Sequence, residues 1–554
     1  MKRTVFGCIL GLLWFAAGFH GCVNPGVLDP SIIARYQKQM ADYAPSDRMG
    51  GQTELGLLDP APREGLAPLK VEEIKDESGA VRRVIRLSLD EAVVRALAGS
   101  PVIQVISFDP AISREDMVQA AAAFDVLVFG TANYAKGDRK RYATSLRSIT
   151  DERSFTLGLR QLLPTGTQWE LTWGATRDWD NAKSFTSPTK FEPTVQFEVT
   201  QPLLRGGWLD FNLGRLRIAR LAHKSQLQAF RSEVEGVITD VYRLYWQLHQ
   251  ARKELEIQSS LVAWSEKTVE EIKGREKLDA PIVQQKQAAS ALASHKGTQV
   301  RLEKIIYDVQ EQLGVLLGDT QISAIGKFQI IPTTPFSDGP VAINVADQLS
   351  AALKHNPTLA QGRLAIQASG VQIKVAKSEL LPRLDVTAST TFQGMAGSSR
   401  VAGRELLSGD YASYSLGIEF EYPIGNRQRK SLLRARKLDR SKAIASFRRN
   451  ADQIAASVKE RVRQIRMALK TLEYERLAVA AYRAELDGLE TIQKTRRGGM
   501  DPEFLELKLR SRERLALAER SELQALVDYN SAVIELRRVT GTVLDLPGLK
   551  VSMP

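Results

Sequence analysis

Two long stretches of the chain repeat apolar residues every three or four positions. The first runs from Leu227 to Leu255, and the second runs from Ile444 to Leu489 with interruptions at Arg461 and Glu475. Alternating steps of three and four are the heptad pattern of helices that pack along their whole length. The pattern predicts long helices at about 207–273 and 427–495. Each would be about 100 Å long at 1.5 Å per residue.

Shorter helical segments flank each long one. Trailing helices are predicted at about 280–317 and 502–541, and leading helices begin at Ser88 and Asn344. The leading helices are expected to be interrupted at three prolines: Pro101, Pro110 and Pro357. A leading and a trailing helix placed end to end roughly match one long helix, so the sequence favours a helical column of even height.

Apolar and polar residues alternate strictly between the leading and long helices. The alternation is clear at Tyr414–Tyr422, and the first strand region holds about four strand candidates: 124–134, 155–163, 168–176 and 194–204. Period two predicts strands with one apolar and one polar face. A soluble sandwich gives this pattern, and so does a transmembrane barrel with a wet lumen. We favour the barrel because the sequence shows no enclosed soluble core for these strands to cover.

The chain contains two copies of one unit. Three pairs of segments match in order: Leu89–Pro101 with Val345–Pro357, Gln201–Gly206 with Tyr422–Arg427, and Leu313–Gly318 with Leu536–Gly541. The first pair is separated by roughly 35 residues more than the others, so an insertion lies between Pro101 and Pro202. We predict repeat 1 over 87–319, a linker over 320–343, repeat 2 over 344–541 and a tail over 542–554.

The first residues predict export. Lys2 and Arg3 precede an apolar stretch from Val5 to Phe19, which is typical of a secretory signal peptide, here 1–21. Cys22 after the cut indicates a lipoprotein anchor, while plain export with an incidental thiol is the alternative. Residues 22–86 are rich in Pro and Gly and are expected to form an extended arm from the anchor. No later stretch approaches the roughly 18 to 20 apolar residues of a spanning helix, so a membrane crossing would need strands.

Composition excludes several classes of protein. The chain has 554 residues, of which 43% are apolar, so it is not a disordered chain. Five His and two Cys leave little material for a metal site or a disulfide framework. We find no phosphate-binding glycine loop and no nucleophile motif, and we expect no enzyme, cofactor or metal. The net charge of +12 would suit nucleic acid, but a signal peptide and the lack of an aromatic-basic patch argue against it.

The order of these elements, with a set of short motifs, resembles the TolC family of outer membrane efflux proteins. The motifs are Leu87–Ala92 with Pro101, Leu163–Thr167, Gln201–Gly207 and Tyr529–Gly541, and the resemblance covers the chain from Arg86 to Gly541. It implies a mainly α fold with a transmembrane β-barrel. Three chains would form a homotrimer, in which four strands per chain close a 12-stranded barrel joined to a long antiparallel α-helical barrel. The surplus of strand candidates forms long external loops or widens the barrel.

The resemblance also implies a function and its partners. The chain would be the outer-membrane exit duct of a tripartite efflux or type I secretion system. It would contact outer-membrane lipid and dock to a periplasmic adaptor (membrane fusion) protein and an inner-membrane pump. The alternative is an exported coiled-coil scaffold or adaptor protein without a pore, whose strands form a soluble sandwich.

The turns that join each long helix to its trailing helix are the predicted functional sites. Four residues are expected to contact the adaptor: Gly274, Arg275, Gly498 and Gly499. Three are candidates for charged rings that constrict the pore: Asp279, Arg497 and Asp501. The same glycines, followed by Pro281 and Pro502, are also ordinary signals for the end of one helix and the start of the next.

Overall fold

The computed structural model describes residues 70–75, 81–140, 147–181, 188–274, 282–318, 328–495 and 502–546. All of them belong to one compact unit, Leu66–Leu546. The predicted signal peptide, the anchor residue Cys22 and most of the predicted arm lie outside the described residues.

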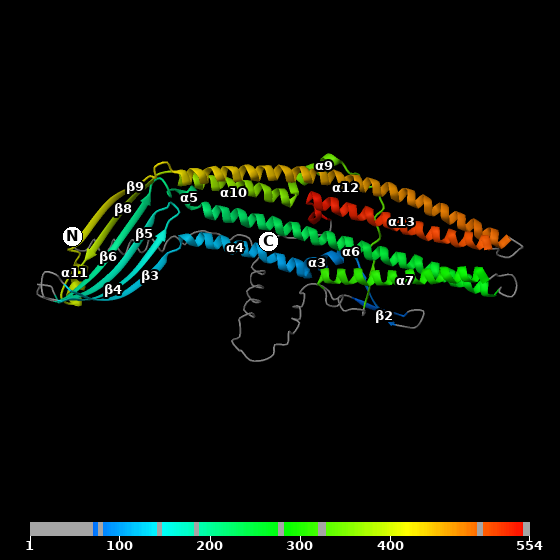
Figure 1. The fold of residues 1–554 in the computed structure, drawn as a ribbon, viewed down its shortest axis with the longest axis horizontal. Helices are drawn as coiled ribbons and strands as arrows, with labels where there is room; N and C mark the ends of the chain where they lie inside the picture. Colours follow the sequence, from blue (N-terminus) through cyan, green and yellow to red (C-terminus); the bar gives the residue numbers. More distant parts are fainter. Residues whose placement is uncertain are drawn as a thin grey trace. The chain divides into compact units, whose positions relative to one another are not determined.

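Helices form most of this unit (Figure 1). The first set comprises α3 (Leu89–Gly99), α4 (Pro101–Ala121), the 3-10 turn η1 (Ala122–Phe124), α5 (Leu209–Asn212), α6 (Gly214–Gly274) and α7 (Ile282–Leu317). The second comprises α9 (Val345–His355), α10 (Pro357–Glu379), α11 (Ser399–Ser408), α12 (Arg427–Thr495), α13 (Pro502–Thr540) and the 3-10 turn η2 (Val543–Asp545). The long helices α6 and α12 contain 61 and 69 residues, as the heptad pattern predicts.

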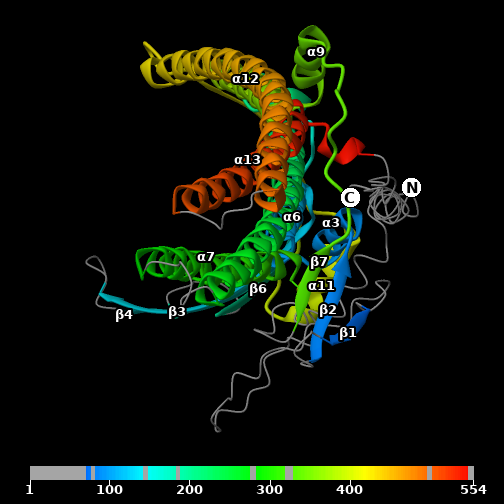
Figure 2. The same cartoon turned by 90° about the vertical axis from the view of Figure 1, so that its right-hand side faces the viewer.

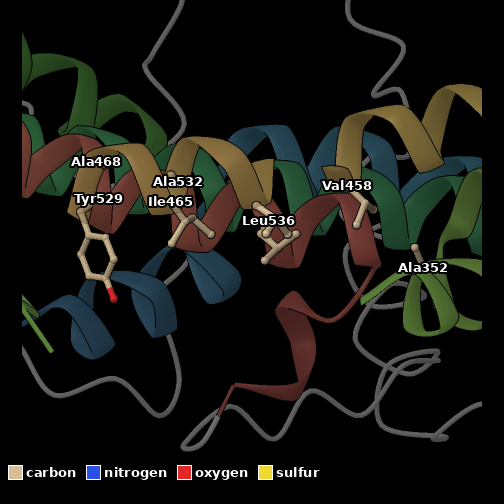
Figure 3. Packing of buried hydrophobic residues seen from close by; sticks show 8 residues of the cluster. Ala352, Val458, Ile465, Ala468, Tyr529, Ala532 and Leu536 are labelled. Atoms are coloured by element: carbon tan, nitrogen blue, oxygen red, sulfur yellow. The ribbon is translucent and has the colours of Figure 1, made fainter. Parts of the chain in front are cut away.

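The helices lie in four neighbouring columns. α6 packs against α4, α7, α10 and α13, and α12 packs against α10 and α13. The lateral order is therefore α4 with α7, then α6, then α10 with α13, then α12. Viewed end-on, the hairpins α6–α7 and α12–α13 lie one above the other (Figure 2). A cluster from α9, α12 and α13 that includes Val458, Ile465 and Tyr529 shows how the heptad side chains fill the space between helices (Figure 3).

The leading helices break where two prolines predict it. Ser100 and Asn356 stand between α3 and α4 and between α9 and α10, each with φ −62° and ψ 124°. Pro110 was expected to make a further break but lies inside α4. Packing of α4 along α6 holds this helix together despite the backbone hydrogen bond that a proline removes.

The trailing helices end against these breaks. Gly318 after α7 and Gly541 after α13 both have positive φ, 63° and 70°. A β-carbon on Gly541 would lie 2.6 Å from the carbonyl oxygen of His355, and one on Gly318 would overlap the carbonyl oxygen of Gly99. Leading and trailing helices therefore meet end to end at equivalent places in both halves of the unit.

The larger sheet contains six antiparallel strands. They are β3 (Leu127–Lys140), β4 (Arg147–Leu162), β5 (Gln168–Asp180), β6 (Thr189–Pro202), β8 (Arg383–Gln393) and β9 (Ala412–Glu421), in that spatial order. All four strand candidates of the first region join this sheet. A 12-stranded barrel shared by three chains needs only four strands from each chain. The observed sheet has two more, so the surplus strand candidates extend the sheet and do not form separate loops.

A second, smaller sheet was not predicted. Its strands are β1 (Val71–Lys75), β2 (Val81–Leu87) and β7 (Gln329–Pro332), with β2 between the other two. The end of the predicted arm and part of the predicted linker are therefore a hairpin and a strand. Tyr245 of α6 fixes this sheet to the helices, because its hydroxyl donates to Leu87 O (3.1 Å) and accepts from Thr334 N (2.9 Å).

Among the helices that the structure describes, none by itself has the length and apolar character to cross a membrane. The bent pair of α3 and the segment Pro101–Phe124 meets those two criteria together, with an angle of 47°.

Candidate membrane-spanning sheet and helical tips

One face of the larger sheet is apolar across all six strands. The strand register places these residues on it, from β3 to β9: Val128, Gly130, Ala132 and Tyr134; Phe155, Leu157 and Leu159; Trp169, Leu171, Trp173 and Ala175; Pro193, Val195, Phe197 and Val199; Leu384, Val386, Ala388 and Phe392; Tyr414, Leu416, Ile418 and Phe420. On the edge strand β9 they are largely exposed, from 66% at Phe420 to 79% at Tyr414. A large exposed apolar face marks a contact with another protein or with a membrane.

The opposite face is polar. It carries Thr131, Asn133, Ser154, Thr156, Thr172, Gln196, Ser389, Ser413 and Ser415, together with the charged residues Glu152, Arg160, Glu170, Glu198, Arg383, Asp385, Glu419 and Glu421. Acidic side chains outnumber basic ones on this face. Strands of 10 to 16 residues reach or exceed the roughly 9 to 11 needed to cross a bilayer at a tilt. The sheet thus has the length and the two-sided polarity of a barrel wall around water.

Helix α11 follows β8 and precedes β9 in the chain, and it lies on the apolar face. It packs against β6 and β8, with Ala402 fully buried and Leu407 74% exposed. An apolar groove of about 580 Å³ separates it from the strands, lined by Phe155, Trp173, Phe191 and Leu406 among others. This helix was not predicted, because its ten residues carry no heptad signal.

A tight turn joins the sheet to the first long helix. Gly166 and Gly206 have φ values of 90° and 82°, and a β-carbon on Gly166 would overlap the carbonyl oxygen of Gly206. Trp208 N donates to Thr165 O (2.9 Å), and Asn212 Nδ2 donates to Gly206 O (2.9 Å). The motifs at 163–167 and 201–207, singled out separately in the sequence, are therefore two sides of one junction.

The ends of the helical hairpins lie at the opposite end of the long helices from the sheet (Figure 1). Gly274 ends α6, is exposed, and has no atom near the position of a β-carbon. The other predicted tip residues, Arg275, Asp279, Arg497, Gly498, Gly499 and Asp501, lie outside the described residues. Just below the tips, Val269, Ile272, Ala288 and Leu505 form a cluster that packs the two hairpins together.

A polar network lies below that cluster. Lys508 and Arg512 of α13 flank the ring of Trp264 of α6, at 5.7 Å and 5.6 Å from its centroid. Arg512 bonds Glu490 of α12 (2.6 Å), and Lys508 bonds Gln493 (2.5 Å). Burial lowers the pKa of Lys508 below its ordinary 10.5. This network joins both hairpins, and the sequence did not reveal it, because Trp264 and Lys508 meet only through the packing of α6 on α13.

A histidine links the same hairpins further from the tip. His295 Nδ1 lies 2.9 Å from Ser265 Oγ, and its Nε2 lies 3.3 Å from Glu513 Oε1. Gln258 Nε2 donates to His295 O (2.7 Å). No group of His, Cys, Asp or Glu within the described part of the chain is arranged to hold a metal ion.

Comparison with known proteins identifies the fold. Residues 348–542 match the family of outer membrane efflux proteins. The matched residues lie in the second half of the chain and include most of the predicted repeat 2. The predicted resemblance to the TolC family is thereby confirmed, and the match to efflux proteins agrees with the prediction that the chain is not an enzyme. No curated protein is similar enough in sequence to count as a match.

Solved structures of outer-membrane channels share the fold over most of the chain. The outer-membrane channel OprN has a TM-score of 0.62 at 16% identity, covering 82% of this chain and 90% of its own. The Campylobacter jejuni CmeC outer membrane channel has a TM-score of 0.62 at 13% identity, with 82% and 86% covered. The Vibrio cholerae outer membrane protein VceC has a TM-score of 0.59 at 14% identity, with 82% and 96% covered. The chain therefore has the helical and strand architecture of these channels.

Proposed function

We propose that this chain is the outer-membrane exit duct of a tripartite efflux or type I secretion system, passing solutes from the periplasm or a pump to the exterior. The observation that carries the proposal is the sheet with one apolar and one polar face, joined through tight turns to helices of 61 and 69 residues. The strands suit a membrane and the helices have the length to extend from it across a periplasm. The alternative, a coiled-coil scaffold or adaptor without a pore, does not explain why this large sheet face is apolar.

The duct is a homotrimer. A single six-stranded sheet leaves unpaired backbone groups at both edges, and hydrocarbon offers them no water to bond. Copies of the chain supply the missing neighbours. We propose three copies, because this is what the family resemblance implies. The polar faces then line a common lumen and the apolar faces contact outer-membrane lipid.

The hairpin ends are the docking points for the periplasmic adaptor and the inner-membrane pump. They lie away from the sheet, so a sheet in the outer membrane places them deep in the periplasm (Figure 1). On this proposal Gly274, Arg275, Gly498 and Gly499 contact the adaptor. Three further residues, Asp279, Arg497 and Asp501, form charged rings that narrow the pore.

The chain has a second attachment to the outer membrane. We propose that residues 1–21 are removed on export and that acylated Cys22 anchors the arm that follows. One acyl chain binds a membrane only marginally, so the anchor supplements the strands. Mass spectrometry of the purified protein should show a lipid-modified N-terminal peptide that Cys22→Ser abolishes. An unmodified peptide from the native protein would reject the anchor.

Fractionation and conductance test the function. In a Gram-negative host the protein should enter the outer membrane and survive mild detergent as a heat-resistant oligomer. In planar bilayers it should form water-filled channels. Recovery as a water-soluble monomer from the periplasm would reject the duct and favour the scaffold.

A further inference from the structure

We propose that three copies of this chain close an 18-stranded barrel, in which β9 of each copy pairs with β3 of the next. The inference rests on the proposed function, since it concerns the wall of the same duct. It assigns the pairing surface between copies and sets the width of the outer-membrane pore.

The additional strands belong to the barrel wall. The pairing of β3 with β4 extends over the full ladder from Leu127↔Arg160 to Lys140↔Arg147, and β4 pairs with β5 from Thr150↔Asp180 to Leu162↔Gln168. The alternation of the two faces also continues without a shift. Val128 and Tyr134 of β3 lie on the apolar face, with exposures of 67% and 62%, whereas Thr131 and Asn133 lie on the polar face. A hairpin outside the membrane would not need an apolar face that continues that of the other strands.

The polar face of this hairpin is also built as part of a wall. A β-carbon on Gly158 of β4 would overlap the ring of Phe129 of β3, so the aromatic ring lies flat over the glycine. The guanidinium of Arg160 covers the same ring at 5.4 Å. Phe129 on the polar side is in this way half-buried by its neighbours, and the polar character of that face is kept.

The two edges of the sheet are compatible with closure. Five antiparallel pairings separate β3 from β9, so these strands run in opposite directions. A β9 edge beside the β3 edge of another copy is therefore antiparallel, as in every other pair of the sheet. On the apolar side, the row Tyr414, Leu416 and Ile418 then meets the row Val128, Gly130 and Ala132. Helix α11 packs over β6 and β8 and leaves both edges accessible.

Six strands span about the width of the helical wall. Each chain contributes four helical columns, which at about 9 Å per helix occupy about 36 Å of circumference. At a spacing of about 4.8 Å and a tilt of about 40°, each strand occupies about 6.3 Å, so six strands span about 38 Å. The outer columns also lead to the outer strands, because η1 after α4 precedes β3, and β9 precedes α12.

The width of the pore follows from the same spacing. Eighteen strands give a backbone circumference of about 113 Å and a diameter of about 36 Å, whereas twelve strands give a diameter of about 24 Å. The outer-membrane section would then be about as wide as the helical section, with room for cargo that a 12-stranded barrel excludes.

Deletion of the hairpin provides a direct comparison. Its two ends are adjacent, since Gln161 Nε2 donates to the carbonyl oxygen of Phe124 at 2.8 Å. Removing 127–162 and joining Val126 to Leu163 leaves four strands per chain. Electron cryo-microscopy of the full chain in lipid nanodiscs should show three copies and 18 strands. The deletion variant should show three copies and 12 strands, with a barrel diameter smaller by about one third.

Crosslinking tests the proposed pairing of β9 with β3 of the next copy without relying on the deletion variant. Leu416→Cys in β9 is combined in turn with Val128→Cys, Gly130→Cys and Ala132→Cys in β3. One or more of these pairs should give covalent trimers with a short bifunctional thiol reagent. The matched control joins Leu416→Cys with Leu171→Cys in β5, an inner strand, and should stay monomeric on denaturing gels.

Two results would overturn the inference. The first is a trimeric barrel of 12 strands with the β3–β4 hairpin outside the wall, in which no β3–β9 pair crosslinks. The second is a dimer whose two sheets make 12 strands. Either result leaves the exit duct standing, whereas a protein that never enters the outer membrane rejects the duct itself.

Discussion

The junction between trailing and leading helices yields a prediction with a built-in control. Gly541 has φ 70°, and a β-carbon there would lie 2.6 Å from His355 O and 2.8 Å from His355 C. Gly541→Ala forces an L-residue into the left-handed region, at a cost of about 1 to 2 kcal/mol. The overlap with backbone adds about 1 to 3 kcal/mol, because backbone atoms move less readily than a flexible side chain. We expect a total loss of about 2 to 5 kcal/mol.

The control is Gly488→Ala inside α12. No atom lies within 4 Å of a β-carbon at Gly488, and the backbone there is helical. Alanine should therefore stabilise that helix by about 1 kcal/mol. The assay is the temperature at which the purified protein loses its helical circular dichroism. Gly541→Ala should lower this temperature and Gly488→Ala should keep or raise it. Equal midpoints for the two variants would refute the steric argument.

Three further predictions concern the tip and the lumen. Burial lowers the pKa of Lys508 below its ordinary 10.5, so between the two pKa values the unfolded chain binds more protons at this side chain than the native protein does. The free energy of unfolding should therefore rise with pH as the pH approaches 10.5. Lys508→Met should show a flatter dependence of stability on pH over that range. The excess of acidic side chains on the polar face should make the pore cation-selective, so Glu170→Gln with Glu198→Gln should shift the reversal potential in a salt gradient towards zero, and an unchanged potential would place these groups away from the ion path. Replacing Gly498 and Gly499 with bulky residues should abolish transport while membrane insertion stays normal, and normal export by that variant would reject the tip assignment.

The sequence predicts the long helices and the main strands because their signals are periodic and local. The structure gives α12 the predicted bounds, 427–495. The first long helix begins later than predicted, at Gly214, because Gly206 and Trp208 turn the chain with φ values of 82° and 69° and α5 intervenes. Neither turn interrupts the heptad pattern, so the sequence did not show where the helix begins.

Contacts between segments far apart in the chain could not be predicted from the sequence. Strand β7 has four residues and pairs with β2 in parallel, so the pairing joins residues far apart in the chain and has no local pattern. Lys508 and Trp264 belong to different hairpins, and each reads as an ordinary helix residue until α6 and α13 pack. The tip residues were predicted only from the glycines and prolines that mark the ends and starts of helices. Of these tip residues the structure describes only Gly274.

The closeness of Phe124 to Gln161 has a consequence for how such ducts change over time. A hairpin whose two ends meet at one point is a module: its gain or loss leaves the helices in place. In the proposed threefold barrel, each such event would change the wall by six strands at once and keep every neighbour antiparallel. On the proposed function, the diameter of the barrel and the contacts at the hairpin ends would therefore be free to diverge separately.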